Sequence, residues 1–244
     1  NRTGVSKDAD SWTIHTGPMA VHDGKADYDI DFKTIDEGPR KFATTGGWLG
    51  FTDLYWLTAV IPDQQTGGEA NFRRNASGGF QADFAGASRL VPPGQAVATT
   101  SRLFAGAKEV RLLEGYEERL GIQRFGTAID WGWFRVLEKP IFYYLDWLFR
   151  LVGNFGVAII ALTFILKTLV FPLARKSYIS MAKMKELQPQ MEALKERTGD
   201  DRMKFQKEMM ELYKREKVNP AAGCLPVLLQ IPIFFALYKV LFVT

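Results

Sequence analysis

The chain has very few of the residues from which metal sites and covalent cross-links are built. Its 244 residues include one cysteine, Cys224, and two histidines, His15 and His22. A single cysteine excludes an intrachain disulfide and a cysteine metal cluster, and two histidines argue against a structural zinc site. No nucleophile–base–acid set or phosphate-binding glycine loop stands out either. We therefore expect a protein that is not an enzyme and that needs no cofactor and no metal.

Charge is nearly absent from two long segments. Residues 153–173 (GNFGVAIIALTFILKTLVFPL) carry Lys167 as their only charged side chain, and residues 222–243 (AGCLPVLLQIPIFFALYKVLFV) carry Lys239. Each run approaches the ~20 predominantly apolar residues that cross a bilayer core. We predict two transmembrane helices, and two buried helices of a soluble protein are the alternative.

The charges outside these runs are unevenly placed. Residues 1–152 carry a net charge of −2 and residues 174–219 a net charge of +4. The positive-inside rule then places residues 174–221 in the cytoplasm and residues 1–152 on the opposite side of the membrane. No leader precedes the first domain, and an exported domain needs a leader or an earlier span. We therefore expect the chain to be a piece of a longer protein.

Residues 1–127 are predicted to form a β-sandwich. Glycine and proline break the segment often, for example at 46–47 and 92–93, with short apolar stretches between the breaks. Lys25–Ile35 alternates apolar and acidic residues, which predicts one half-buried strand. A calcium loop fails there because Phe32 stands where the loop needs glycine. Residues 108–120 have helical spacing.

Residues 128–152 change character. The segment WGWFRVLEKPIFYYLDWLFRLV mixes three tryptophans and five other aromatic side chains with five charged ones. Amphipathic aromatic side chains favour the headgroup zone, so we predict an interfacial amphipathic helix that lies along the membrane. A helix packed on the β-sandwich is the alternative.

Residues 174–221 are predicted to form a cytoplasmic helical hairpin. Helical periodicity appears twice, Pro189 should bend or interrupt the first helix, and the turn is expected at 198–201. Six of the seven methionines lie here. Methionine adapts to many apolar partners, so these side chains either receive varied segments or hold the two helices together.

Three polar residues are predicted to meet inside the membrane. Lys167 lies near the cytoplasmic end of the first span, where its ammonium could also snorkel to the headgroups. Gln230 falls at a similar depth in the second span, and Thr163 shares a helical face with Lys167. Polar groups at this depth favour a hydrated recess open to the cytoplasm. Prolines 172, 226 and 232 should bend or loosen these helices.

Specific motifs then point to a family. They are GNFGVAIIALTF…FPL, SYISMAKMKELQP, GDD, EMMELYK and KVNPAAGCLPVLLQIPIFFALY. By these the part from Trp131 to Thr244 strongly resembles YidC, the bacterial inner-membrane insertases, whose relatives act in mitochondria and chloroplasts. GGWLGFTDLYWLTAVIP is similar to the family's periplasmic domain, a β-sandwich like sugar-mutarotase folds. Against the family plan, we expect this chain to lack the first span, the start of the periplasmic domain and the later spans.

The resemblance implies a membrane protein insertase and chaperone. The polar end of a nascent membrane protein would enter a positively charged groove, and its apolar segment would leave along the second span into lipid. Lys167 stands where the family usually has arginine. The lysine keeps the positive charge but lacks the planar guanidinium that binds a carboxylate through two hydrogen bonds. The resemblance also implies partners, namely nascent membrane proteins, membrane lipid, the Sec translocon and the ribosome, with no sequence-specific nucleic acid. The residues that the resemblance implies to contact the substrate are Leu228, Gln230, Ile231, Phe234 and Tyr238. Ordinary packing against another helix is the alternative for each of them.

Two other functions stay open from the residues themselves. One is a transporter or channel subunit in which Lys167 relays protons or gates a pore. The other is a periplasmic carbohydrate-binding module anchored by the two spans. The architecture we predict is an α+β membrane protein of the bacterial inner membrane. It comprises a periplasmic antiparallel β-sandwich over 1–127, an interfacial helix over 128–152, transmembrane helices over 153–173 and 222–243, and a cytoplasmic helical hairpin over 174–221.

Overall fold

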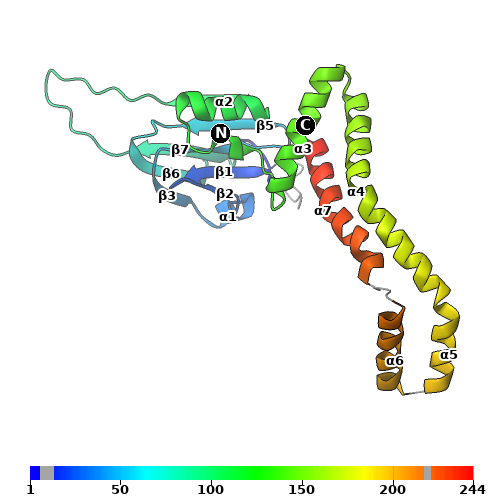
Figure 1. The fold of residues 1–244 in the computed structure, drawn as a ribbon. Coiled ribbons are helices and arrows are strands. Elements are labelled where there is room, and N and C mark those ends of the chain that lie inside the picture. The colour runs from blue at the N-terminus through cyan, green and yellow to red at the C-terminus, as the bar shows by residue number, and fades with distance from the viewer. Residues whose placement is uncertain (6–13, 200, 217–220, 244) are drawn as a thin grey trace. The chain divides into compact units, whose positions relative to one another are not determined.

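The computed structural model divides the chain into two compact units. It describes residues 1–5, 14–199, 201–216 and 221–243, with the side chains of 227–242 in the last segment. Asn1–Trp133 form a β-rich unit and Phe134–Val240 a helical unit, and each is considered by itself (Figure 1). Asp200 of the expected turn, residues 217–220 of the last motif, and the side chains of Cys224 and Pro226 lie outside the described residues.

Two antiparallel sheets make up the β unit, which confirms the predicted α+β class with antiparallel strands. The five-stranded sheet has the order β2-β1-β4-β5-β8, and the three-stranded sheet has the order β3-β6-β7. The strands are β1 Gly17–His22, β2 Lys25–Asp27, β3 Arg40–Thr45, β4 Trp48–Thr52, β5 Trp56–Ile61, β6 Gly67–Arg74, β7 Phe80–Gly86 and β8 Arg102–Ala107.

Aromatic side chains fill the space between the two sheets. Phe51 of β4 meets Phe72 of β6 edge to face with ring centroids 5.9 Å apart, and Phe32 contacts Phe80 of β7 at 4.7 Å. Phe72 is fully buried and Phe80 nearly so. Such aromatic pairs add to the burial of their own area, so they hold the sheets face to face.

A helical layer covers the other side of β4. All five residues of β4 are buried, and the short helix η1 (Phe125–Ala128) packs on its outer face. The helix α2 (Val110–Leu120) packs on the same sheet through Tyr116, which contacts Phe104 of β8. Trp48 of β4 packs edge-on against Phe125 at 5.4 Å. A continuous apolar run such as WLGFT is typical of a strand buried on both faces. The helix expected over 108–120 is confirmed as α2.

The turn between β3 and β4 depends on glycine. Gly47 has φ +77°, and a Cβ built on it would lie 1.9 Å from the carbonyl oxygen of Val21 on the neighbouring strand. Only glycine accepts both the left-handed backbone and this close approach. The turn therefore fixes the register in which β4 pairs with β1.

The prediction of one strand over Lys25–Ile35 is wrong beyond Asp27. A helix, α1 (Phe32–Glu37), begins where the strand was expected to continue. Asp31 caps it by accepting a hydrogen bond from the Thr34 backbone N–H, and the Thr34 hydroxyl accepts one from the Asp31 N–H. Phe32 and Ile35 then both enter the core, because a spacing of three puts them on one helical face.

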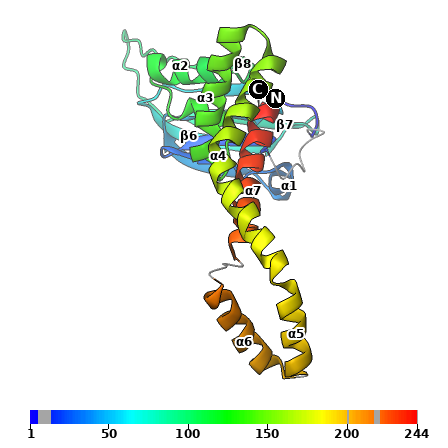
Figure 2. The ribbon, with the colours of Figure 1, turned by 45° about the vertical axis from the view of Figure 1, so that its right-hand side comes forward.

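The helical unit begins with two helices packed against each other. α3 (Arg135–Val152) and α4 (Phe155–Glu186) run antiparallel, joined by Gly153 in the left-handed region and by Asn154, which caps α4 (Figures 1 and 2). Trp131 is buried and belongs to the β unit, so α3 starts later than the predicted 128–152. Whether α3 lies along a membrane interface stays a prediction.

The predicted break at Pro189 is confirmed. α4 ends at Glu186, and Pro189 occupies the first turn of α5 (Gln188–Thr198). Gly199 follows α5, and Asp201 caps α6 (Arg202–Arg215) by accepting from the Lys204 N–H at 3.0 Å. α4 runs through Pro172 without ending there, so the first arm of the hairpin continues the apolar helix.

The last helix, α7 (Ala221–Val243), forms one continuous element. Among the described residues one helix, α4, is long and apolar enough to cross a membrane, while the apolar stretch Val227–Phe242 of α7 is shorter. The second span therefore stays a prediction.

Candidate functional site

The length of α4 shows how far Lys167 lies from the two ends of the apolar stretch. Its 32 residues extend about 48 Å at 1.5 Å per residue, well beyond a hydrocarbon core of about 30 Å. Only 11% of its most apolar 18-residue window is buried inside the protein, unlike the core helix of a soluble domain. Lys167 lies about 18 Å beyond Phe155 and about 12 Å before Arg175. Its Cα is therefore well inside the apolar stretch.

Lys167 is exposed, and it makes no hydrogen bond or ion pair within the part of the chain that the structure describes. Thr163, one turn earlier, is half-buried and donates its hydroxyl hydrogen to the Ile159 carbonyl oxygen at 2.8 Å. Thr168 does the same to Phe164 at 2.8 Å. Both threonine hydroxyls thus donate to carbonyl oxygens of their own helix. The ammonium of Lys167 keeps its hydrogen-bond donors available for another molecule.

α7 has two different faces. The exposed fractions of Leu228, Ile231, Phe234 and Tyr238 are 61%, 47%, 61% and 49%, and Gln230 is half-buried. At about 100° per residue, Gln230, Ile231, Phe234 and Tyr238 fall within about 100° of the helix circumference, and Leu228 lies about 60° beyond Ile231. The inward face is buried and carries Ala236, Lys239 and Val240.

Sequence reasoning missed Val227, which is 61% exposed and extends the outward face by one turn toward the start of α7. Its spacing of four from Ile231 was the available signal. No hydrogen bond joins Lys167 to Gln230 or Thr163 among the described residues. The structure thus places the residues on the expected helix faces without linking them directly.

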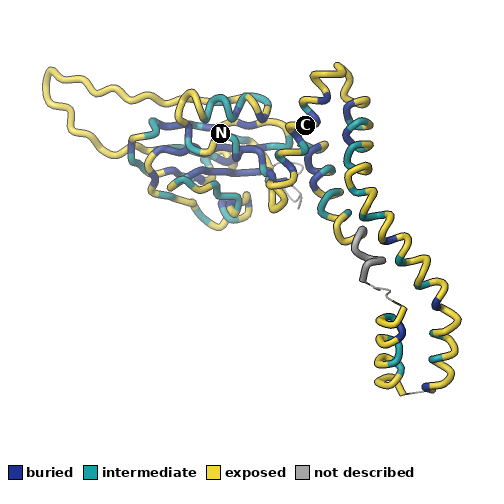
Figure 3. Tube along the Cα trace, viewed as in Figure 1, coloured by how far each residue is buried: buried dark blue, intermediate teal, exposed yellow. Residues whose placement is uncertain are grey.

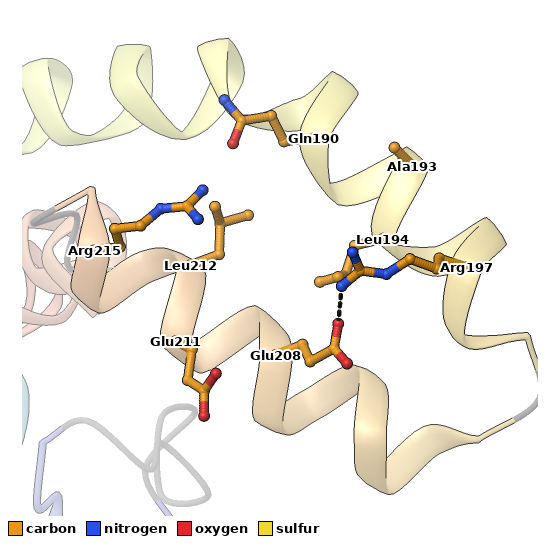
Figure 4. Close-up of a pocket in the computed structure, with 8 residues that line it drawn as sticks. All are labelled: Gln190, Ala193, Leu194, Arg197, Glu208, Glu211, Leu212 and Arg215. Atoms are coloured by element: carbon orange, nitrogen blue, oxygen red, sulfur yellow. Dashed lines mark hydrogen bonds and ion pairs between the residues drawn. The ribbon is translucent and has the colours of Figure 1, made fainter.

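A groove lies between α5 and α6 in the hairpin (Figure 4). Its volume is about 840 Å³, with Leu194 and Leu212 on its apolar surface. Arg197 of α5 forms an ion pair with Glu208 of α6 across the groove, and Arg215 extends along it (Figure 4). The sequence did not predict this ion pair, because the two residues come from different helices and no local spacing relates them. The remaining lining residues are Gln190, Ala193 and Glu211.

The hairpin methionines divide between the two roles considered for them. Met181, Met203 and Met210 are exposed, whereas Met191 is half-buried and its sulfur accepts a hydrogen bond from the Tyr213 hydroxyl at 3.5 Å. One set thus faces outward while Met191 joins α5 to α6. Thioether groups suit both positions because they are flexible and polarizable.

Another lysine, Lys108, lies half-buried in the β unit. The Lys108 ammonium donates to the Thr52 hydroxyl at 2.9 Å beside Asp130 and Asp53. Burial lowers the pKa of Lys108 to about 8, against the opposing pull of the two carboxylates. Burial also lowers the pKa of His15, whose ring lies 2.7 Å from the Pro18 carbonyl oxygen. The adjoining cavity holds about 10 Å³, room for about one water and not for a sugar.

Within residues 1–5, 14–199, 201–216 and 221–243, no cluster of three or more histidine, cysteine, aspartate or glutamate side chains is placed to hold a metal ion. The groups that stand out are an exposed cation on an apolar helix and an apolar face on α7. Both suit contact with an extended chain or with lipid.

Comparison with known proteins covers nearly the whole chain. The YidC periplasmic domain family matches residues 1–144, and the 60Kd inner membrane protein family matches residues 147–244. The membrane protein insertase YidC of Zymomonas mobilis subsp. mobilis is 49% identical over 248 residues, which cover 100% of this chain and 43% of that protein. The YidC of Paracoccus denitrificans is 58% identical over 244 residues, covering 96% of this chain and 38% of that protein.

The antiparallel β unit lies in the region that matches the YidC periplasmic domain family, and the membrane-length apolar helix α4 lies in the region that matches the 60Kd inner membrane protein family. The chain belongs to the YidC family, as its motifs indicated. It spans about two fifths of the length of the curated relatives it matches.

Proposed function

We propose that this chain is the part of a membrane protein insertase that receives polar segments at Lys167 and guides apolar segments along α7. Two findings support the proposal. Lys167 is an exposed cation on the apolar part of α4, and it has no partner among the residues that the structure describes. The relatives are named membrane protein insertases.

The chemistry of insertion explains why these groups suffice. A nascent membrane protein must carry its polar end past apolar lipid, and an isolated charge there is costly. A fixed ammonium attracts the acidic residues of that end. A hydrated recess around it would shorten the apolar barrier that they cross. The apolar segment then leaves into lipid, where burial contributes about 25 cal/mol per Å² of apolar surface. No nucleotide or metal enters this scheme.

The outward face of α7 provides the exit path. Phe234 and Ile231 are large, apolar and exposed. Such side chains favour aggregation in water, whereas in lipid their exposure is favourable. The hairpin, with its basic residues and exposed methionines, would lie in the cytoplasm beside the ribosome, and the Sec translocon would be a neighbour in the membrane. Residues 1–152 would lie on the periplasmic side of the membrane.

Site-specific crosslinking during synthesis tests this function. A photoreactive residue at Phe234 or Gln230 of the full-length protein should capture a small nascent membrane protein with an acidic tail. The same residue at Ala236, which is fully buried on the inward face, is the matched control and should capture little. Equal capture at Ala236 and Phe234, or none at either, would contradict the proposal.

A transporter subunit predicts a different result. Solute flux through liposomes that carry the full-length protein would support that function, and flux should depend on Lys167. We expect crosslinks to nascent chains and no such flux.

A further inference from the structure

Two helices of the helical unit each bury one charged side chain on an otherwise apolar inward face. On α3, Glu138 is 1% exposed. On α7, Lys239 is 9% exposed. The neighbours that share these faces at helical intervals are Phe142, Leu145 and Leu148 on α3, and Ala236 and Val240 on α7.

A ring contact aligns the two helices. Phe134, which precedes the first turn of α3, stacks on Phe235 of α7 with ring centroids 6.5 Å apart and planes 16° apart. Within this unit α3 and α7 run in the same direction, opposite to α4 (Figures 1 and 2). Glu138 and Lys239 each lie four residues beyond a stacked ring, about 6 Å further along its helix and on the same side. The stack therefore brings the carboxylate and the ammonium to one level.

Opposite charges at one level in a buried region stabilise each other. A lone carboxylate or ammonium away from water is strongly unfavourable, whereas a hydrogen-bonded pair compensates much of that cost. We propose that Glu138 and Lys239 form a buried ion pair between α3 and α7 that fixes the rotation of α7 about its axis.

The fixed rotation is what makes the pair useful to the function proposed above, on which this role rests. Phe234 lies about 140° around α7 from Lys239. When Lys239 is held against α3, Phe234 is therefore directed outward, where it is 61% exposed. Glu138 and Lys239 would act as positioning residues, since they orient the substrate-contacting face without touching the substrate.

A disulfide test measures the proximity without reference to insertion. In the full-length protein with Cys224→Ser, the pair Glu138→Cys and Lys239→Cys should cross-link under mild oxidation in membranes. The control pair Val136→Cys and Lys239→Cys should not, because Val136 is 84% exposed on another side of α3. Equal cross-linking of both pairs, or none for Glu138→Cys with Lys239→Cys, would overturn the ion pair.

A charge exchange measures the coupling. Glu138→Lys and Lys239→Glu should each lower insertion about tenfold, the factor that a coupling of about 1.4 kcal/mol gives, and the double exchange should restore most of it. A double exchange no better than the worse single variant would overturn the pair. Normal insertion by every variant would overturn the positioning role. If the unsubstituted protein inserted nothing, the proposed function would fail while the disulfide result stood.

Discussion

The two units of this protein treat their apolar side chains in opposite ways. In the β unit Met19, Phe72 and Phe125 have no exposed surface, whereas in the helical unit Phe164, Leu169 and Phe234 are 73%, 71% and 61% exposed. The contrast is visible in Figure 3, where the strands are mainly dark and α4 is mainly light. One unit carries its own core, and the other requires an apolar solvent around it.

The same contrast separates two lysines. Lys108 is half-buried and hydrogen-bonded to Thr52, with carboxylates nearby. Lys167 is exposed on an apolar helix and has no partner within the described part of the protein. The first is a structural cation whose partners belong to its own unit. The second would, in the function proposed above, offer its charge to the substrate.

The largest expected effect comes from removing a core ring. Phe72→Ala should destabilise the β unit by about 3–5 kcal/mol, because it leaves a cavity between the two sheets. Phe164→Ala, its matched control on α4, should leave the stability of the detergent-solubilised protein nearly unchanged. Urea-dependent proteolysis of the full-length protein measures both. Equal losses of stability in the two variants would contradict the view that only the β unit depends on a core of its own.

Charge reversal at the membrane lysine should affect function by a similar amount. Lys167→Glu should lower insertion of substrates with acidic tails about a hundredfold, since like charges brought together cost several kcal/mol. Lys167→Arg should retain insertion, and Lys167→Ala should fall between. Lys185→Glu, an exposed lysine further along α4, is the control for net charge. Normal insertion by Lys167→Glu would remove the charge mechanism.

The lowered pKa of Lys108 predicts a pH dependence of stability in the β unit. The pKa of Lys108 is about 8 in the folded protein and about 10.5 when unfolded. Between these values the unfolded chain binds more protons, so stability should rise with pH from about 8 to 10.5, and this gain should be lost as pH falls from 10.5 to 8. The rise should be about 3 kcal/mol.

Lys108→Met should flatten that rise, while Lys41→Met, on the exposed side of β3, should leave it in place. The measurement is the urea midpoint of the β unit in the full-length protein between pH 7 and 11. An identical rise in Lys108→Met would show that another group titrates.

Helix caps should give the smallest effects. Asp31→Ala removes the cap of α1 and should cost about 1 kcal/mol of β-unit stability, because Phe32 and Ile35 depend on that helix to enter the core. Asp201→Ala removes an equivalent cap from α6 and should change only local amide exchange there. Global destabilisation by Asp201→Ala would show that the hairpin is coupled to the rest of its unit.

Local patterns predicted the elements whose signal is local. The spacing in 108–120, the break at Pro189 and the turn around Gly199 are all decided within a few residues, so sequence sufficed. The strand expected through Ile35 failed because alternation over Tyr28, Ile30 and Phe32 also fits a strand end followed by a capped helix. The cap formed by Asp31 and Thr34 decided between them.

The sequence also predicted the candidate site only as far as local patterns allow. Motifs and hydropathy identified the family, the apolar run around Lys167 and the residues on α7. Pairings between separate helices, such as Arg197 with Glu208 or Phe134 with Phe235, carry no sequence spacing that would reveal them.

By itself the sequence determined that the chain is a YidC-family protein with a β-rich half and an apolar, lysine-bearing half, because composition and short motifs act locally. The tertiary structure decided which face of each helix is buried. It placed Lys239 and Glu138 inward, left Lys167 and Phe234 exposed, and half-buried Lys108 beside Thr52. These outcomes depend on packing between segments far apart in the chain, since burial is a property of the whole fold.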